Sequence, residues 1–377
     1  MSQTEQATLL GLTLQELTHI AEECGEASYR GRQLFEALYS QRVESGEQIS
    51  TLPQEFRRNL AEGGFSVGLP KIEKKFLSND GTARYLTGFA DGQSVETVWM
   101  PEGDGGEAGD GSEAGNEADK PAGRTWDRAT ICVSSQVGCA VDCQFCLTAL
   151  LGVKRNLTAG EIVGQIHAVL NDRGVSPPQD RVNVVFMGMG EPLLNYYNFI
   201  KAVGLLVEGV GIPESRMTVS TAGIVSRIYD LGAERVRPKL AISLNASNDE
   251  LRTRLMPLNR KWNLEKLMAA ARDFPLRNRE RITFEYVLLN GVNDSTENAG
   301  EVVELLRGMR AKVNLIALNP GPGIDFSTPA EERVAAFQQV LTRAGIPAFV
   351  RRPRGRDIYA ACGQLKQTVE LATAPAV

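Results

Sequence analysis

The strongest constraint on the fold is a regular alternation of strand-like and helix-like segments after residue 127. A run of βα units favours a parallel sheet, because parallel strands need a crossover and a helix provides it. The pattern therefore predicts an α/β fold, either a partial or full barrel or a doubly wound sheet. In either fold the chemistry collects at the carboxyl ends of the strands. The six strand-like segments are ATICVS, VNVVFMG, RMTVSTAG, KLAISLN, ITFEYVLL and VNLIALN.

Capping signals predict where some helices of this region begin and end. Thr158 and Glu161 have the spacing of a capping box, for a helix that runs to about Asp172. Pro329 is expected in the first turn of a later helix, which Gly345 ends.

The first hundred residues have a different pattern, helices followed by short strands. Thr13 and Glu16 form a second predicted capping box, and Pro53 is expected to open a later helix. Three alternating segments then follow between residues 71 and 101, separated by the hairpin signals Asn-Asp-Gly and Asp-Gly. We therefore expect an N-terminal α+β accessory domain over residues 1–101, the barrel over 127–350 and a basic C-terminal segment over 351–377.

The negative charge of the chain is concentrated in one segment. The formal net charge is −5, yet residues 102–119 contain seven acids and no base, and without them 41 bases face 39 acids. Residues 102–126 are also rich in glycine, so they bury too little apolar surface to fold, and a disordered acidic loop is predicted there. Arginine clusters elsewhere, at 277–281 and 351–356, are compatible with a nucleic-acid partner.

The cysteines require an explanation other than disulfide bonds. Six cysteines in this length are too few for a disulfide scaffold. The N-terminus lacks the features of a secretory signal, and no apolar run reaches about 18 residues, so a cytoplasmic protein with no membrane contact is expected. In that reducing compartment, metal binding or catalysis is the expected use of the thiols.

Three of these cysteines, Cys139, Cys143 and Cys146, lie close together just after the first strand of the βα run. Thiolates hold iron–sulfur clusters, and three of them leave one iron of a 4Fe-4S cluster open to a ligand. The spacing favours such a cluster. The alternative is a structural zinc site with Cys132 as its fourth ligand, although zinc sites usually contain paired cysteine knuckles.

The motif C-x-x-x-C-x-F-C after the first strand of a six-unit βα run resembles the radical S-adenosylmethionine superfamily. The segments ATICVSSQVGC, GMGEPL, TVSTAGIV, LAISLNA and RDIYAACGQL, in this order, resemble one family within it. These are the dual-specificity RNA methyltransferases that methylate carbon 2 of adenine in 23S rRNA and tRNA. The resemblance implies a partial, TIM-like (β/α)₆ barrel of the radical-SAM type with an N-terminal accessory domain. It also implies two molecules of S-adenosyl-L-methionine per turnover.

The resemblance also implies which residues bind the cofactors. Cys139, Cys143 and Cys146 would hold one 4Fe-4S cluster, whose open iron binds S-adenosylmethionine. Further cofactor contacts would come from the later strand ends. Position 245 often carries histidine in the family, and the asparagine here still offers a donor and an acceptor. The implied cofactor-binding residues are Gly190, Glu191, Ser220, Ser243, Leu244, Asn245 and Asn319.

Three residues outside these sets match catalytic positions of the family. Cys362 would accept a methyl group from the sulfonium by displacement, because a thiolate is a nucleophile and adenine carbon 2 is not. The 5′-deoxyadenosyl radical would then activate the S-methyl group for addition to carbon 2. Glu96, on a face shared with Val98, would remove the carbon 2 proton, and a dry setting would raise its pKa. Cys132 would attack the sulfur of the adduct and release the RNA.

The resemblance further implies the partners. They are 23S rRNA and tRNA, and an electron donor such as flavodoxin or ferredoxin, with the chain acting as a monomer. The N-terminal domain with Arg30 and Arg32, and the basic tail before Cys362, are the predicted RNA contacts. Two alternatives remain at this point. One is the related enzyme that methylates carbon 8 of the same rRNA adenine, and the other is a zinc-stabilised RNA-binding module without catalysis.

Overall fold

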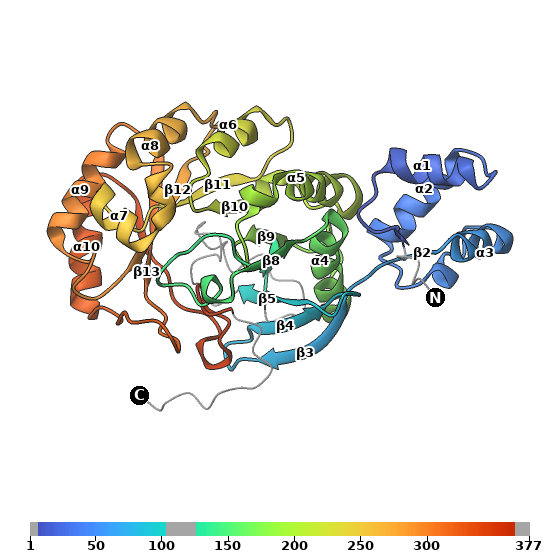
Figure 1. Ribbon diagram of the computed structural model, residues 1–377, viewed down its shortest axis with the longest axis horizontal. Helices are drawn as coiled ribbons and strands as arrows, with labels where there is room; N and C mark the ends of the chain where they lie inside the picture. The colour runs from blue at the N-terminus through green and yellow to red at the C-terminus, as the bar shows by residue number, and fades with distance from the viewer. Residues whose placement is uncertain (1–6, 103–125, 366–377) are drawn as a thin grey trace.

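The computed structural model describes residues 7–102 and 126–365 (Figure 1). The acidic segment and the last residues of the basic tail lie outside these ranges, except for positions 102 and 126. The described residues include no helix that is both long enough and apolar enough to cross a bilayer.

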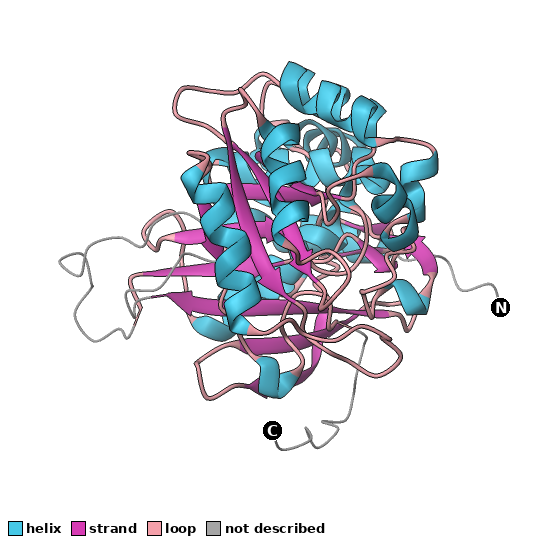
Figure 2. Cartoon of the chain, turned by 90° about the vertical axis from the view of Figure 1, so that its left-hand side faces the viewer, coloured by secondary structure: helices cyan, strands magenta, loops and turns pink. Residues whose placement is uncertain are grey.

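A curved sheet of ten strands forms the centre of the molecule (Figure 2). Its order is β14-β13-β12-β11-β10-β9-β6-β5-β4-β3, and all pairs from β6 to β14 are parallel. The predicted α/β class and partial barrel are confirmed, since each of the six strand-like segments contains one parallel strand. These strands are β6 (Arg128–Cys132), β9 (Val182–Phe186), β10 (Met217–Thr221), β11 (Lys239–Ser243), β12 (Ile282–Leu288) and β13 (Ala311–Ala317), followed by β14 (Ala348–Val350).

Helices cover the outer face of this sheet, as Figure 1 shows. The outward side chains of the strands are buried against them, for example Val219, Ile242 and Phe284, each with no more than 1% exposure. The inward side chains are more polar and line the interior of the barrel. The helices of the barrel region are α4 (Ala159–Arg173), α5 (Tyr196–Leu205), α6 (Val225–Ala233), α7 (Asp249–Leu255), α8 (Leu264–Asp273), α9 (Thr296–Leu306) and α10 (Glu331–Arg343).

The predicted helix ends are largely correct. Thr158 and Glu161 form both hydrogen bonds of a capping box at the start of α4, and Thr13 and Glu16 do so at α1. Pro329 is not in the first turn of α10, because that helix starts at Glu331 with Ala330 as its N-cap.

The N-terminal helices form a group beside α4 and α5 (Figure 1). Tyr39 fixes this group, since its hydroxyl donates to the Leu12 carbonyl and accepts from the Gly11 amide. Arg42 then reaches the barrel, donating to Asn171 and to the Val175 carbonyl. The elements here are β1 (Ala7–Thr8), α1 (Leu14–Glu23), α2 (Tyr29–Phe35), α3 (Gln54–Glu62) and β2 (Phe65–Ser66).

The three short strands expected in the N-terminal domain continue the barrel sheet. They are β3 (Lys71–Leu77), β4 (Ala83–Gly88) and β5 (Ser94–Glu102), and β5 pairs antiparallel with β6, with Val98 opposite Cys132. This pairing places Glu96 and Cys132 on neighbouring strands. The domain boundaries given above remain a prediction.

Candidate active site

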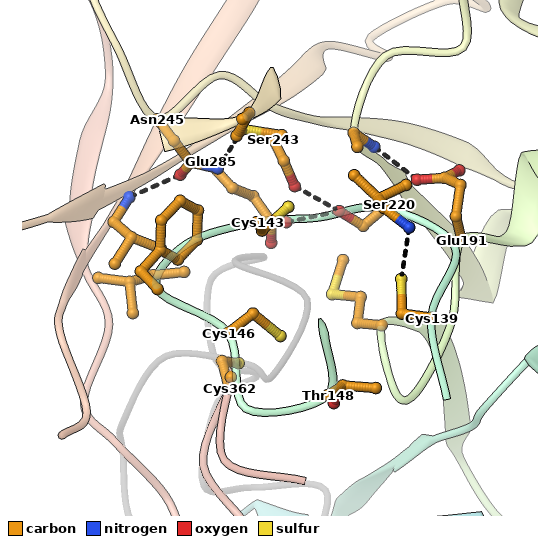
Figure 3. A pocket seen from close by; sticks show the side chains of 18 of the residues that line it. Cys139, Cys143, Cys146, Thr148, Glu191, Ser220, Ser243, Asn245, Glu285 and Cys362 are labelled. Carbon is orange, nitrogen blue, oxygen red and sulfur yellow. Dashed lines mark hydrogen bonds between the residues drawn. The ribbon is translucent and has the colours of Figure 1, made fainter. Parts of the chain in front are cut away.

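The carboxyl ends of the parallel strands surround one cavity (Figure 3). The predicted metal ligands, most of the predicted cofactor residues and Cys362 all contribute to its wall. Their convergence follows from the topology, because parallel strands end at the same edge of a sheet. The lining residues used below are Cys139, Cys143, Cys146, Gly190, Glu191, Ser220, Ser243, Asn245, Glu285, Asn319 and Cys362.

The loop after β6 carries the three clustered cysteines, all half-buried. Cys146 closes a turn by donating its amide to the Cys143 carbonyl at 3.1 Å. The Val141 amide donates to the Cys139 sulfur at 3.4 Å. Burial raises the pKa of Cys139 to about 12 and that of Cys143 well above its usual range. Metal binding here would therefore release protons, because the ligand is the thiolate.

The geometry of these thiols fits a cluster better than a single ion. In the described parts of the chain, no three His, Cys, Asp or Glu side chains converge on one metal position. A 4Fe-4S cluster does not need such convergence, since each thiolate binds a different iron. The zinc alternative required Cys132 near the three other sulfurs. Cys132 is instead at the end of β6 and does not line the cavity.

Gly190 and Glu191 form a rigid turn after β9. Gly190 has a φ of +97°, and a Cβ there would lie 2.6 Å from the side chain of Gln136, so only glycine fits. Both carboxylate oxygens of Glu191 accept backbone amides, from Leu193 at 3.0 Å and from Ala222 at 2.7 Å. Burial raises the pKa of Glu191 to about 7, although these amides oppose the shift.

Ser220 and Ser243, on neighbouring strands, lie together at the base of the cavity with hydroxyls 3.3 Å apart. Ser220 also donates to Glu285 on β12 at 2.6 Å. The sequence analysis did not single out Glu285. Alternation along β12 was the available signal, because Glu285 shares a face with Thr283 and Val287 and interrupts an otherwise apolar strand.

The two predicted residues that follow Ser243 differ in their surroundings. Leu244 is fully buried and its side chain is not part of the cavity wall. Asn245 lines the cavity, has a left-handed backbone with φ +56°, and uses its side-chain oxygen to accept the Val287 amide. Its amide nitrogen contacts the Met256 sulfur at 3.4 Å. The Asn245 side chain is therefore occupied by protein contacts.

Asn319 has an acceptor left for a ligand. Its side-chain nitrogen donates to the Cys362 carbonyl at 3.3 Å, while its buried Oδ1 has no hydrogen-bond partner among the described residues. A buried orphan acceptor is costly unless something bonds to it. Since Asn319 lines the cavity, this atom fits a bound molecule with an N–H or O–H donor, and S-adenosylmethionine has both.

Cys362 reaches the cavity on a loop that follows β14, and Figure 3 shows it beside Cys146. Backbone contacts fix this loop against the cluster loop. Leu147 donates to the Gly363 carbonyl at 2.9 Å, and the buried hydroxyl of Thr148 donates to the Leu365 carbonyl at 2.6 Å. The Cys362 residue is exposed, whereas Cys132 is buried.

Cys362 acts electrostatically on Cys132. Burial raises the pKa of Cys132 far above its usual range, and Cys362 adds to the shift. Cys362 is exposed as a residue, but its thiol lies in the wall of the cavity, where desolvation raises its pKa and Glu285 contributes. Cys362 on the tail thus influences Cys132 at the end of β6 through this charge effect, and of the two only Cys362 lines the cavity.

The side chain of Glu96 is buried, as predicted, but its ion-pair partner Arg84 was not predicted. Its side chain is 1% exposed on β5 and forms an ion pair with the equally buried Arg84 of β4. Arginine stabilises the ionised carboxylate, which is the form that accepts a proton. Glu96 is not among the residues that line the cavity. The structure therefore does not bring Glu96 to the cavity wall where Cys362 lies.

Comparison with known proteins agrees with this geometry. A family model described as the radical SAM superfamily matches residues 133–303. A crystal structure of a radical SAM methyltransferase from Sphaerobacter thermophilus is 41% identical and covers 96% of this chain and all of that one, with a TM-score of 0.85. Fold and site thus define a radical SAM enzyme that binds a 4Fe-4S cluster and S-adenosylmethionine.

Two relatives of known family identify which radical SAM family the chain resembles. A probable dual-specificity RNA methyltransferase RlmN from Koribacter versatilis is 66% identical, over 93% of this chain and 99% of the relative. A dual-specificity RNA methyltransferase RlmN from Syntrophobacter fumaroxidans is 46% identical, over 94% and 96%. The chain belongs to the dual-specificity RNA methyltransferase RlmN family.

The cluster assignment predicts that each of the three cysteine variants loses iron and both reactions at once. Replacing Cys139, Cys143 or Cys146 with alanine should reduce bound iron to background and abolish 5′-deoxyadenosine formation and RNA methylation together. Iron analysis of anaerobically purified protein measures the first effect. The matched control is Cys24→Ala, a half-buried thiol in the N-terminal helices, which should retain its iron. Methylation by a variant without iron would contradict the assignment.

Proposed function

We propose that this chain methylates carbon 2 of adenine in 23S rRNA and tRNA through a methyl group carried by Cys362. The main support is the position of Cys362. The loop that carries it is joined to the cluster loop by a hydrogen bond between residues 217 positions apart in sequence. A thiol that accepts the methyl group must contact the S-adenosylmethionine that binds at the cluster. The hydrogen bond from Thr148 to Leu365 would keep the Cys362 loop beside the cluster loop.

Each cavity residue has a distinct part in this proposal. When bound, the cluster and S-adenosylmethionine supply both a methyl group and a 5′-deoxyadenosyl radical. The turn at Gly190 and Glu191 would orient the cofactor's ammonium, because an ionised carboxylate fixed by two amides favours a cation nearby. Ser220, Ser243 and Asn319 would bind its remaining polar groups, Asn245 would shape the wall, and Leu244 would support that wall from the core behind it.

Release of the product is assigned to two further residues. Cys132 would attack the sulfur of the protein–RNA adduct, since it is the buried thiol at the end of β6 on which Cys362 acts electrostatically. The step leaves a Cys132–Cys362 disulfide, which a reductant must open before the next cycle. Glu96 would accept the carbon 2 proton, with Arg84 keeping it ionised until then.

RNA would approach from the side that exposes the tail and the N-terminal helices. Arg352 and Arg356 are exposed next to the Cys362 loop, and Arg32 is exposed on α2. A base in folded RNA must be unstacked to enter the cavity, at a cost of a few kcal/mol. Residues 1–101 would serve as the RNA-binding accessory domain and 351–377 as a second contact. A flavodoxin or ferredoxin would supply electrons to a monomeric, cytoplasmic enzyme.

Product analysis tests the proposed function directly. Mass spectrometry of nucleosides from reacted 23S rRNA and tRNA should find 2-methyladenosine in both. The 8-methyl isomer in its place would assign the chain to the carbon 8 reaction. Unmodified RNA, together with full conversion by a related enzyme under the same conditions, would refute the proposal.

Replacement of Cys132 and replacement of Cys362 should stop the reaction at different steps. Cys132→Ala should still join protein to RNA and then stop, because no thiol attacks the adduct. It should accumulate as a nuclease-sensitive conjugate on a denaturing gel. Cys362→Ala and the double variant should form none, since they lack the linking sulfur. If Cys132→Ala gave free, unmodified RNA and no conjugate, the proposed resolving role of Cys132 would be wrong.

A further inference from the structure

Two carboxylates line the active-site cavity, and the roles assigned so far use only one of them. Both oxygens of Glu191 are occupied by backbone amides. Glu285 differs, because its Oε2 accepts the Ser220 hydroxyl at 2.6 Å while its side chain makes no other hydrogen bond within the described residues. Glu285 is half-buried and faces the cavity, as Figure 3 shows. It is the cavity carboxylate with an oxygen available to a reacting group.

The charged and titratable groups around Glu285 come from several elements. Ser220 and Ser243 approach from β10 and β11, and Glu285 acts electrostatically on Cys132 of β6 and on Cys362 of the tail. Burial raises the pKa of Glu285, whereas the Ser220 hydrogen bond and the positive charges of Arg351 and Lys312 lower it. Burial has the largest influence, so the pKa of Glu285 lies above its usual value, which suits a carboxylate that accepts a proton.

Methyl transfer to Cys362 requires a base that accepts the proton of the thiol. A thiol is a weak nucleophile until it loses its proton, and Cys362 lies in the wall of the same cavity as Glu285. Histidine, the usual base, is absent from the cavity. The chain has two histidines, and His19 pairs with Glu23 on α1 while His167 is buried beside Tyr39.

We propose that Glu285 is a catalytic residue that accepts the Cys362 proton as the thiol takes up its methyl group. This inference rests on the proposed role of Cys362. The carbon–sulfur bond of the sulfonium breaks, its electron pair stays on the departing S-adenosylhomocysteine, and a new bond joins the methyl carbon to the Cys362 sulfur. The thiol proton moves to Glu285, directly or through one water. A cationic donor and a carboxylate are thus converted to neutral products. Glu285 returns its proton to solvent afterwards.

The test is Glu285→Gln in the holoenzyme, with intact-protein mass spectrometry of Cys362 methylation before any RNA is added. Removing a general base typically costs at least about 100-fold in rate. We expect a loss of about that size near neutral pH, shrinking as pH rises because hydroxide then removes the proton. Binding of S-adenosylmethionine, measured by equilibrium dialysis, should stay close to wild type. Glu285→Asp should recover part of the rate.

Glu285→Ala provides a second line of evidence, because its enlarged cavity admits formate. Formate should restore Cys362 methylation, and chloride at the same concentration should not. A wild-type rate in Glu285→Gln would overturn the inference. So would a defect that is equal at every pH, is explained by lost cofactor binding, or is not relieved by formate in Glu285→Ala. Absence of methyl-Cys362 in the wild-type enzyme would instead refute the proposed function itself.

Discussion

Parallel pairing from β6 to β14 is the constraint on which the site depends. It brings the carboxyl ends of all these strands to one edge, and each strand contributes a group there. Gly190 and Glu191 follow β9, Ser220 is on β10, Ser243 ends β11, and Glu285 is on β12. Curvature of the sheet then closes these groups around a shared cavity. The outer helices provide the hydrophobic burial that allows so polar an interior, since the free energy of folding comes mainly from the apolar outer faces.

The tail completes the cavity through polar contacts, not through another strand. The loop that carries Cys362 is bonded to the cluster loop at Leu147 and Thr148, and to the end of β13 through Asn319. A third anchor comes from the β3–β4 hairpin, where Asp80 accepts the Gly355 amide at 3.0 Å. The loop that carries Cys362 is therefore positioned by three separate parts of the chain. Such placement matters for group transfer, because small displacements of reacting atoms are costly in rate.

Sequence patterns predicted much of this fold because they report local physics. Strand alternation, the capping boxes at Thr13 and Thr158, and the cysteine spacing all act over short distances. The ion pair of Arg84 with Glu96 depends on the register between β4 and β5, which no local pattern fixes. Glu285 was missed although alternation along β12 was a local signal, because its contact with Ser220, 65 residues away in sequence, is a long-range property. The continuation of the barrel sheet into β3–β5 is likewise a long-range property.

The central claim is that the methyl group reaches RNA by way of Cys362. The most direct measurement uses enzyme whose Cys362 already carries an isotopically labelled methyl group, freed of labelled cofactor and then given RNA and unlabelled S-adenosylmethionine. In a single turnover the label should leave the protein and appear in the methyl carbon of the modified adenine. Product with an unlabelled methyl group, while the label stays on Cys362, would contradict the account.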